Sequence, residues 1–353
     1  MPKQIIIDCE RMKYPHTGLY NYCYNLGIAL QKAANPASEG LTFFLPRKQL
    51  DIFGRGQNYL VQNSLHKLIL PSLKKYAVWH CTHQDADYFP SKNTLPIVLT
   101  IHDFNILHNK KNRDGRKKAA FISGVQKKIN QASHVTFISS FTKRDVQQYI
   151  DLGNKPVSVI YNGCNIKEIE QLIIPAFAPT FPYYFTIGTI MEKKNFHVLP
   201  ALLVGNDRQL IIAGITQNEN YKQKIINEAM KYGVANRLIF TGPISENDKQ
   251  WYLKNCEAFV FPSIAEGFGL PVVEAMYFGV PIFLSSFTSL PEIGGDVCYY
   301  FSSFEKESMQ QTIKNGLAHY TSTGAQTRIK RRAALFNWGE AAAQYLEVYR
   351  SLY

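Results

Sequence analysis

Residues 263–281, SIAEGFGLPVVEAMYFGVP, place two glutamates in a stretch that is otherwise almost entirely apolar or glycine. Acidic side chains seldom enter a protein interior without partners. The preceding AFVFPS predicts a short buried strand, Pro271 suits the first turn of a helix, and Gly279 suits its C-terminal cap. We therefore expect a strand, a glycine loop and a helix, with Glu266 on the loop and Glu274 about one turn into the helix.

This order of elements suits a ligand that carries a phosphate group. A helix N-terminus behind a glycine loop offers N–H groups to phosphate, and a carboxylate one turn later can accept hydrogen bonds from ribose hydroxyls. Gly267 and Gly269 would let the ligand approach the backbone. The alternative is that both glutamates are surface residues that the helix dipole favours near the helix N-terminus.

Strand-like and helix-like segments alternate on both sides of this stretch, as in parallel sheets covered by helices. Pro175, Pro179 and Pro182 interrupt the alternation, because proline is costly inside a helix or a central strand. We predict an α/β fold of two doubly wound, Rossmann-like domains that face each other across a cleft. The predicted bounds are 1–172 for the N-terminal domain, 173–182 for a linker, 183–335 for the C-terminal domain, and 336–353 for a final helix that packs back toward the N-terminal domain.

The charge of the chain indicates an anionic partner. The 353 residues carry a net charge of +12. Residues 108–129 hold eight Lys or Arg against one Asp, and RIKRR forms a second cluster at 328–332. Such clusters attract nucleic acid, anionic lipid or a phosphorylated substrate. A solvated helix face explains either cluster equally well.

Hydrophobicity and cysteine usage indicate the compartment. No run of about 18 uncharged apolar residues occurs, so we expect no transmembrane helix. The six cysteines form no Cys-x-x-Cys pair, and the first residues read as a strand rather than a secretion signal. We therefore expect reduced thiols and a cytoplasmic location.

Residues 261–296, FPSIAEGFGLPVVEAMYFGVPIFLSSFTSLPEIGGD, resemble the signature of the retaining glycosyltransferases of family 4, also called glycosyltransferase group 1, which have the GT-B fold. Further segments resemble the same family in the same order: HTGLYNYCYNL (16–26), VLTIHDF (98–104) and FTIGTIMEKKNFHVL (185–199). The resemblance covers nearly the whole chain. It implies that the N-terminal domain binds the acceptor and that the C-terminal domain binds a nucleotide-sugar.

The resemblance also implies roles for single residues. Glu266 would contact the transferred sugar, Glu274 would hold the ribose hydroxyls, Lys194 would neutralise the departing phosphate, and His102 would lie near the reacting carbon. We thus predict His102, Lys194 and Glu266 as catalytic. The predicted donor-binding residues are Gly18, Thr189, Lys193, Gly214, Ile244, Gly267, Phe268, Gly269, Leu270 and Glu274.

One position departs from the family pattern. Many members carry arginine directly after the glycine that matches Gly188, whereas this chain has Thr189. We expect Lys194, assisted by Lys193 or another cation, to hold the phosphate instead. No cofactor or metal is expected, although HCTHQDADYFP at 80–90 contains metal-type side chains and an Asp-x-Asp pattern; it matches an ordinary acceptor-side loop of the family.

Together these features predict a retaining glycosyltransferase that moves a sugar from a nucleoside-diphosphate donor to a glycan or lipid-linked glycan in bacterial surface polysaccharide or lipopolysaccharide synthesis. Mannose from GDP-mannose is the leading candidate, because the GT…KKN pattern resembles relatives that use it. Two alternatives stay open: a nucleotide-sugar epimerase on the same fold, and a non-catalytic basic protein that binds nucleic acid. No nucleic-acid motif is present, so we expect no nucleic-acid partner.

The basic run at 108–129 also predicts peripheral binding to an anionic membrane surface. Phe121 and Ile122 lie between its lysines, and Lys74 and Lys75 follow an apolar stretch beginning at residue 65. Basic residues near a negatively charged leaflet, combined with a few inserted apolar side chains, give reversible docking.

Overall fold

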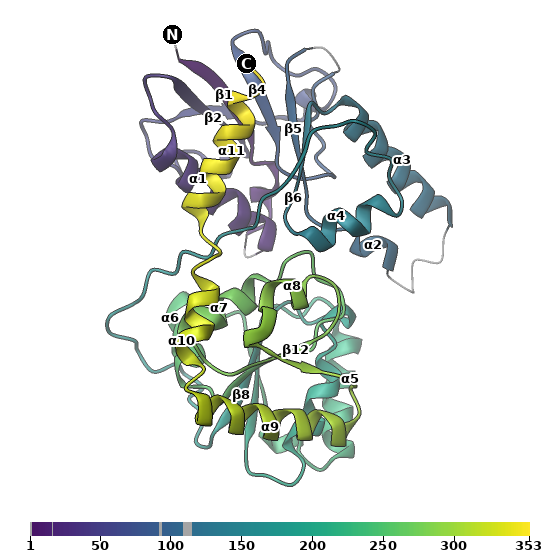
Figure 1. The fold of residues 1–353 in the computed structure, drawn as a ribbon, viewed down its shortest axis with the longest axis vertical. Coiled ribbons are helices and arrows are strands. Elements are labelled where there is room, and N and C mark those ends of the chain that lie inside the picture. Colours follow the sequence, from purple (N-terminus) through teal and green to yellow (C-terminus); the bar gives the residue numbers. More distant parts are fainter. Residues whose placement is uncertain (1, 16, 92–93, 109–114) are drawn as a thin grey trace. The chain divides into compact units, whose positions relative to one another are not determined.

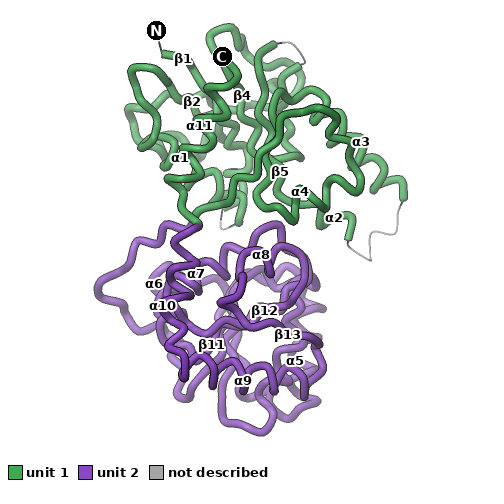
Figure 2. Tube along the Cα trace, viewed as in Figure 1, with its two compact units in different colours: residues 1–163, 336–353 green, residues 164–335 purple. Residues whose placement is uncertain are grey.

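The computed structural model describes residues 2–15, 17–91, 94–108 and 115–353. The chain forms two compact units (Figure 2). Unit 1 comprises residues 1–163 and 336–353, and unit 2 comprises residues 164–335. Each unit has its own parallel sheet with helices around it (Figure 1). The predicted pair of doubly wound α/β domains is therefore confirmed.

Unit 1 is built on a seven-stranded parallel sheet in the order β3-β2-β1-β4-β5-β6-β7. Its central strands are short apolar runs buried on both faces, as parallel sheets require. The strands are β1 (Lys3–Asp8), β2 (Glu39–Leu45), β3 (Asn58–Val61), β4 (Tyr76–Cys81), β5 (Ile97–Ile101), β6 (His134–Phe137) and β7 (Val157–Val159). The helices are α1 (Gly18–Ala33), α2 (Asn105–His108), α3 (Gly115–Gln131), α4 (Ser140–Gln147) and α11 (Trp338–Arg350), with 3₁₀ turns η1 (Glu10–Lys13), η2 (Arg47–Gln49) and η3 (Ser64–Lys67).

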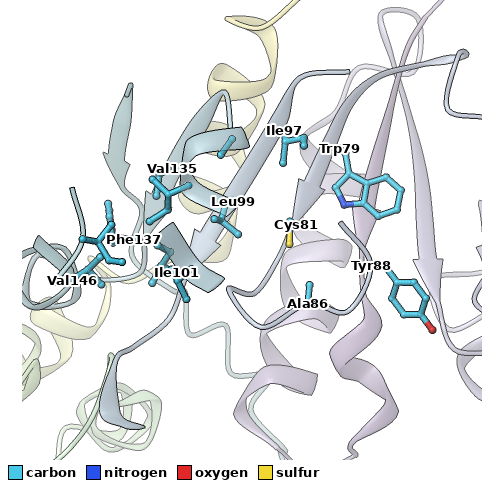
Figure 3. Close-up of a cluster of buried hydrophobic side chains, with 14 of the residues drawn as sticks. Trp79, Cys81, Ala86, Tyr88, Ile97, Leu99, Ile101, Val135, Phe137 and Val146 are labelled. Atoms are coloured by element: carbon cyan, nitrogen blue, oxygen red, sulfur yellow. The ribbon is translucent and has the colours of Figure 1, made fainter. Parts of the chain in front are cut away.

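One face of this sheet carries a continuous hydrophobic core, part of which is drawn in Figure 3. Trp79, Leu99 and Phe137 come from three neighbouring strands, and Val125 and Ile129 of α3 cover them. All five side chains are almost completely buried. Because side chains alternate along a strand, the residues between them point to the opposite face.

That opposite face is covered by α1 and α11, which lie side by side in Figure 1. Tyr349 of α11 contacts the imidazole of His80, with 2.7 Å between its hydroxyl oxygen and Nδ1. The Tyr345 hydroxyl lies 2.7 Å from the Tyr22 hydroxyl and 3.1 Å from that of Thr100. These buried polar groups satisfy one another, which ties α11 to unit 1.

The boundary between the units differs from the predicted one. Unit 1 ends at Gly163, not at residue 172, and the segment predicted as a linker belongs to unit 2. The reason is hydrogen bonding to side chains of unit 2. The Gln250 amide donates to the Lys167 carbonyl at 2.9 Å, and Asn247 accepts from Ile173 N–H at 2.9 Å.

Unit 2 contains a six-stranded parallel sheet in the order β10-β9-β8-β11-β12-β13. Its strands are β8 (Tyr183–Ile187), β9 (Gln209–Ala213), β10 (Leu238–Gly242), β11 (Ala258–Phe261), β12 (Ile282–Ser285) and β13 (Tyr299–Phe301). Its helices are α5 (Glu219–Lys231), α6 (Glu246–Asn255), α7 (Leu270–Phe278), α8 (Leu290–Gly294), α9 (Lys306–Thr323) and α10 (Gln326–Ala333), with 3₁₀ segments η4 (Glu192–Lys194), η5 (Phe196–Leu203), η6 (Ala235–Arg237) and η7 (Gly295–Val297).

The strand order of unit 2 reverses between β8 and β11. The chain runs outward from β8 through β9 to β10, and then returns to place β11 on the other side of β8. Loops that leave the carboxyl ends of two such strands diverge, and ligands of open α/β sheets bind at this point. The segments after β8 and β11 contain Lys194 and Glu266.

Candidate active site

Lys194 and Glu266 meet at the point where the strand order of unit 2 reverses. The Lys194 Nζ lies 2.5 Å from Glu266 Oε1, and the two side chains are only 11% and 12% exposed. The Ser263 hydroxyl lies 2.6 Å from the same carboxylate oxygen. The ammonium group also lies 4.9 Å from the centre of the Phe261 ring, a cation–π distance. The site thus contains a largely buried pair of opposite charges.

The carboxylate of this pair remains ionised. Burial raises the pKa of Glu266, but the charges of Lys194 and Lys193 and the hydrogen bonds from Lys194 and Ser263 outweigh burial and bring the pKa below its usual value. The backbone of Lys193 also takes part, since its carbonyl accepts a hydrogen bond from Ile264 N–H at 2.9 Å. The loops after β8 and β11 are therefore joined by both charge and backbone hydrogen bonds.

The loop after Glu266 has the geometry expected of a glycine loop before a helix. Gly269 is the residue that precedes α7, and its φ of 106° lies in the region that favours glycine. Gly267 and Phe268 are buried, and Leu270 opens the helix. The partial positive charge of the α7 N-terminus therefore begins four residues after the Glu266 carboxylate, where a phosphate would gain from it.

Two residues from the loop after β12 support this arrangement, and the sequence did not point to them. The Thr288 hydroxyl accepts from Glu266 N–H at 3.1 Å, and Ser289 donates to the carbonyls of Glu266 and Phe268 at 3.1 and 2.9 Å. Thr288 has a φ of 57°, which is unfavourable for a β-branched residue. Such strain persists where surrounding structure holds it, often at functional sites. The Ser/Thr-rich SSFTS that follows an apolar run was the available signal.

Glu274, on α7, is held by a lysine from α6. Lys249 Nζ lies 2.7 Å from Glu274 Oε1 and 2.9 Å from Glu246 Oε2. Burial lowers the pKa of Lys249, but the two carboxylates outweigh burial and raise it above the usual lysine value. Lys249 therefore stays charged and fixes the Glu274 side chain. The sequence prediction missed it, because 25 residues separate the partners.

The predicted donor-binding glycine Gly214 is required by the packing of the chain itself. Its φ is 133°, and a Cβ there would lie 2.1 Å from the Gly188 carbonyl oxygen. Its N–H donates to the Gly242 carbonyl at 2.8 Å. A Cβ on Gly188 would approach Lys194 Cε at 3.3 Å, so this glycine leaves room for the lysine. Thr189 and Ile244 are half-buried in loops at the same edge of the sheet.

The other two predicted residues, His102 and Gly18, lie in unit 1. His102 follows β5, and its Nε2–H donates to the Thr82 carbonyl at 2.8 Å while its N–H donates to the Gln84 side chain at 3.0 Å. Burial lowers the pKa of His102 to about 4, so the imidazole is neutral at pH 7. Gly18 opens α1, and a Cβ there would meet nothing within 4 Å. No described neighbour therefore requires glycine at this position.

The metal-type side chains of residues 80–90 are engaged elsewhere. His80 Nε2 lies 2.8 Å from the Thr100 hydroxyl, inside the network of α11. The His83 ring accepts from Asp85 N–H at 3.0 Å, and Asp87 pairs with Lys67 at 2.7 Å. Across the described ranges, no three His, Cys, Asp or Glu residues converge as a metal site would need. Metal-independent activity stays a prediction.

Comparison with known proteins identifies the family. The family model "Glycosyl transferases group 1" matches residues 169–315, and "Glycosyltransferase Family 4" matches residues 42–168. The two matches are contiguous and reach into both units. The chain belongs to the group 1 glycosyltransferases of family 4. The family expected from the resemblance is therefore confirmed.

Two mannosyltransferases that resemble this chain match it over different lengths. O-antigen chain mannosyltransferase B of Escherichia coli is 24% identical over 390 residues, which cover 99% of this chain and 100% of that protein. The serotype-specific mannosyltransferase WbdA of Escherichia coli is 26% identical over 287 residues, covering 76% of this chain and 34% of WbdA. This chain thus spans about a third of the length of WbdA.

Solved structures confirm the GT-B fold. HepE of Anabaena, in complex with UDP and glucose, superposes with a TM-score of 0.74 at 15% sequence identity and covers 99% of this chain and 100% of its own. At this identity the likeness concerns the fold.

Proposed function

We propose that this family 4 glycosyltransferase transfers a hexose, with mannose as the leading candidate, from a nucleoside-diphosphate donor to a hydroxyl group of a glycan or lipid-linked glycan, with retention of anomeric configuration. The observation that carries the proposal is the buried Lys194–Glu266 pair beside the glycine loop of α7. Glu266, Glu274 and the α7 N-terminus lie in one loop–helix segment, and the Lys194 ammonium group reaches it from η4. Together these groups match the charges and hydroxyls of a nucleotide-sugar.

The donor would be bound by three groups of unit 2. Glu274 accepts hydrogen bonds from the ribose hydroxyls, with Lys249 fixing its carboxylate. The α7 N-terminus receives the diphosphate. Glu266 accepts from hydroxyls of the transferred sugar. The UDP and UDP-glucose complexes of HepE support a nucleotide-sugar donor as the ligand class.

Lys194 would supply the electrostatic stabilisation of the leaving group. In the transition state the bond between the anomeric carbon and the phosphate oxygen lengthens, and negative charge grows on the diphosphate. Lys194 Nζ lies against Glu266 in the structure, so the diphosphate has to share this ammonium with the carboxylate. The strongest contact of Lys194 with phosphate would then develop as charge leaves the sugar, which favours the transition state over the bound donor.

The residues favour a front-face reaction. The acceptor oxygen bonds to the anomeric carbon on the face that the phosphate leaves, and the acceptor proton passes to a phosphate oxygen. Glu266, held by Lys194 and Ser263, would orient the sugar rather than attack it. His102, neutral at pH 7, would contact the sugar as a hydrogen-bonding group rather than as a cation.

The names of the relatives support mannose as the transferred sugar and a surface polysaccharide as the product. O-antigen chain mannosyltransferase B matches over its whole length, and WbdA is also a mannosyltransferase. GDP-mannose is accordingly the first donor to test. As in the sequence-based prediction, no divalent metal or cofactor is proposed.

A panel of sugar nucleotides tests this function. GDP-mannose is expected to raise the unfolding temperature more than UDP-glucose, UDP-galactose or dTDP-rhamnose, because bound ligand stabilises the native state. Transfer to a mannose-terminated acceptor should then give an α-linked product, measured by the one-bond C1–H1 coupling in its NMR spectrum. Stabilisation by none of the nucleotides would contradict the donor site, and a β-linked product would contradict retention alone.

A further inference from the structure

The segment that joins β3 to β4 in unit 1 exposes three large aliphatic side chains. Leu65, Leu68 and Ile69 are 72%, 86% and 78% exposed. They are three of the four most exposed large apolar side chains among the described residues, and they fall within five positions. An exposed apolar cluster of this kind marks an interaction site more often than chance placement does.

This segment is anchored, so the exposure is built into the fold. Asn63 Oδ1 accepts from His66 N–H at 3.1 Å and caps η3, and Lys67 pairs with Asp87 at 2.7 Å. On its inner side, Leu70 and Leu73 pack against the hydrophobic core of unit 1. The exposed side chains of Leu65, Leu68 and Ile69 are therefore attached to a backbone that is anchored to unit 1.

The charges near Leu65, Leu68 and Ile69 indicate which kind of partner would cover them. Residues 63–84 contain no Asp or Glu, and the Asp87 carboxylate that reaches this segment is paired with Lys67. Lys74 and Lys75 follow the aliphatic cluster and are exposed. A docking surface for another protein would be expected to use aromatic or arginine anchors. Aliphatic side chains flanked by lysines instead fit an anionic bilayer, where the side chains enter the acyl region and the ammonium groups remain at the headgroups.

Helix α3, which the sequence suggested for this role, does not supply inserted side chains. Phe121 packs edge-on against Phe104, with ring centres 5.1 Å apart, and Ile122 packs against the core. Lys118 and Lys128 donate to backbone carbonyls of unit 1. Of the other basic residues expected to contribute, Arg116, Lys117 and Lys127 are exposed on α3, whereas Lys110, Lys111 and Arg113 lie outside the described residues.

We propose that residues 64–75 are a membrane-docking segment that inserts Leu65, Leu68 and Ile69 into an anionic bilayer. The aliphatic cluster follows the carboxyl end of β3, whereas Lys74 and Lys75 lead into the amino end of β4, so the segment runs along the side of the sheet. The link to a lipid-linked acceptor rests on the proposed function, whereas the docking itself does not. Across the described ranges no helix combines the length and apolar character needed to span a bilayer, so the proposed contact is interfacial.

Vesicle binding tests the segment directly. The protein should sediment with vesicles of phosphatidylglycerol and phosphatidylcholine, bind less as salt rises, and bind pure phosphatidylcholine weakly. The L65S/L68S/I69S variant should lower the partition coefficient by about tenfold or more, because buried aliphatic area drives insertion. Lys74→Glu with Lys75→Glu should reduce both binding and its salt dependence. The matched control is I173S/I174S/L335S, three similarly exposed aliphatic residues of unit 2, which should bind as the unchanged protein does.

A second readout reports insertion rather than binding. In the Leu68→Trp variant, lipids brominated on their acyl chains should quench tryptophan fluorescence. The quenching should exceed that in the unchanged protein, which contains three tryptophans. Equal vesicle binding by L65S/L68S/I69S and the unchanged protein would overturn the proposal, as would no binding to anionic vesicles. If that variant lost self-association but kept vesicle binding, the segment would instead be an interface between two copies of this chain. Glu274→Ala should bind vesicles normally, so a failed donor site and a failed docking segment give different results.

Discussion

At the scale of single residues, the site depends on charges that are buried together. Lys194→Ala is expected to lower kcat by about a hundredfold or more, because an electrostatic stabiliser of the leaving group is lost. The measurement is steady-state transfer from GDP-mannose. Lys231→Ala, which removes an exposed lysine of α5, is the control. Unchanged kcat in Lys194→Ala would assign the leaving-group charge to another cation.

Glu274 and Lys249 should act mainly on donor binding. Glu274→Ala removes charge-assisted hydrogen bonds to ribose, each worth about 1.5–3 kcal/mol, so the Kd for GDP should rise at least about tenfold. Lys249→Met should raise the same Kd, because Glu274 loses the partner that orients it. Glu266→Ala should instead lower kcat with a smaller effect on Kd for GDP. Calorimetric titration with GDP separates these outcomes, and a normal Kd in Glu274→Ala would refute its ribose contact.

His102 should make the stability of the protein sensitive to acid. Its folded-state pKa of about 4 lies below the unfolded value of 6.5. Between these values the unfolded state binds the proton and the folded state does not, so stability is complete above pH 6.5 and falls as pH decreases toward 4. From pH 7 to pH 5 this costs about 2 kcal/mol. Urea unfolding at pH 7 and pH 5 should give a smaller difference in unfolding free energy for His102→Gln than for the unchanged protein. An unchanged difference would exclude His102 as a cause of the acid sensitivity.

The sequence predicted the residues of the site that lie within one motif and missed those that reach it from elsewhere. Glu266, Gly269 and Glu274 belong to one strand–loop–helix segment whose local pattern is informative. Lys249 and Thr288 come from other loops and helices, and their side chains contact the motif only after folding. A lysine on a polar helix and a threonine in a loop carry no local sign of that contact.

At the scale of elements, two glycines at helix starts should behave in opposite ways. Gly269→Ala forces a left-handed φ on alanine and places a Cβ 3.0 Å from Leu290 Cδ2, so stability should fall by about 1–3 kcal/mol. Gly18→Ala opens α1 with a Cβ in open space, so the unfolding free energy should be unchanged or slightly higher. If Gly18 admits a ligand, as the family resemblance implies, the variant should raise KM while remaining stable. Unfolding curves and KM values for both variants decide between these roles.

Three prolines led to the prediction of a linker at residues 173–182. Pro175, Pro179 and Pro182 exclude a helix, and the structure has none there. They do not exclude an extended segment that packs on its neighbour. Asn247 and Gln250 of α6 supply the hydrogen bonds that hold this segment to unit 2. Hydrophobic periodicity could not reveal them, because both side chains are polar.

At the scale of the whole molecule, α11 completes the fold of unit 1. Tyr345→Phe leaves the shape of the core intact and removes a hydroxyl shared among Tyr22, Thr100 and Thr136. The expected loss is about 1–3 kcal/mol of unfolding free energy, because buried polar groups lose a partner. Urea unfolding followed by circular dichroism measures the change. Tyr353→Phe, near the surface, is the control and should be neutral.

The division of unit 1 into two stretches of chain sets an order of events during synthesis. Residues 164–335 form a continuous unit that can fold as soon as it leaves the ribosome, since domains generally fold as units during translation. The sheet of unit 1 is translated earlier, but Tyr22, His80 and Thr100 stay without their α11 partners until residues 336–353 emerge. The first half of the nascent chain would thus be the last to reach its native state, and a chaperone that guards it should be released only after unit 2 is complete.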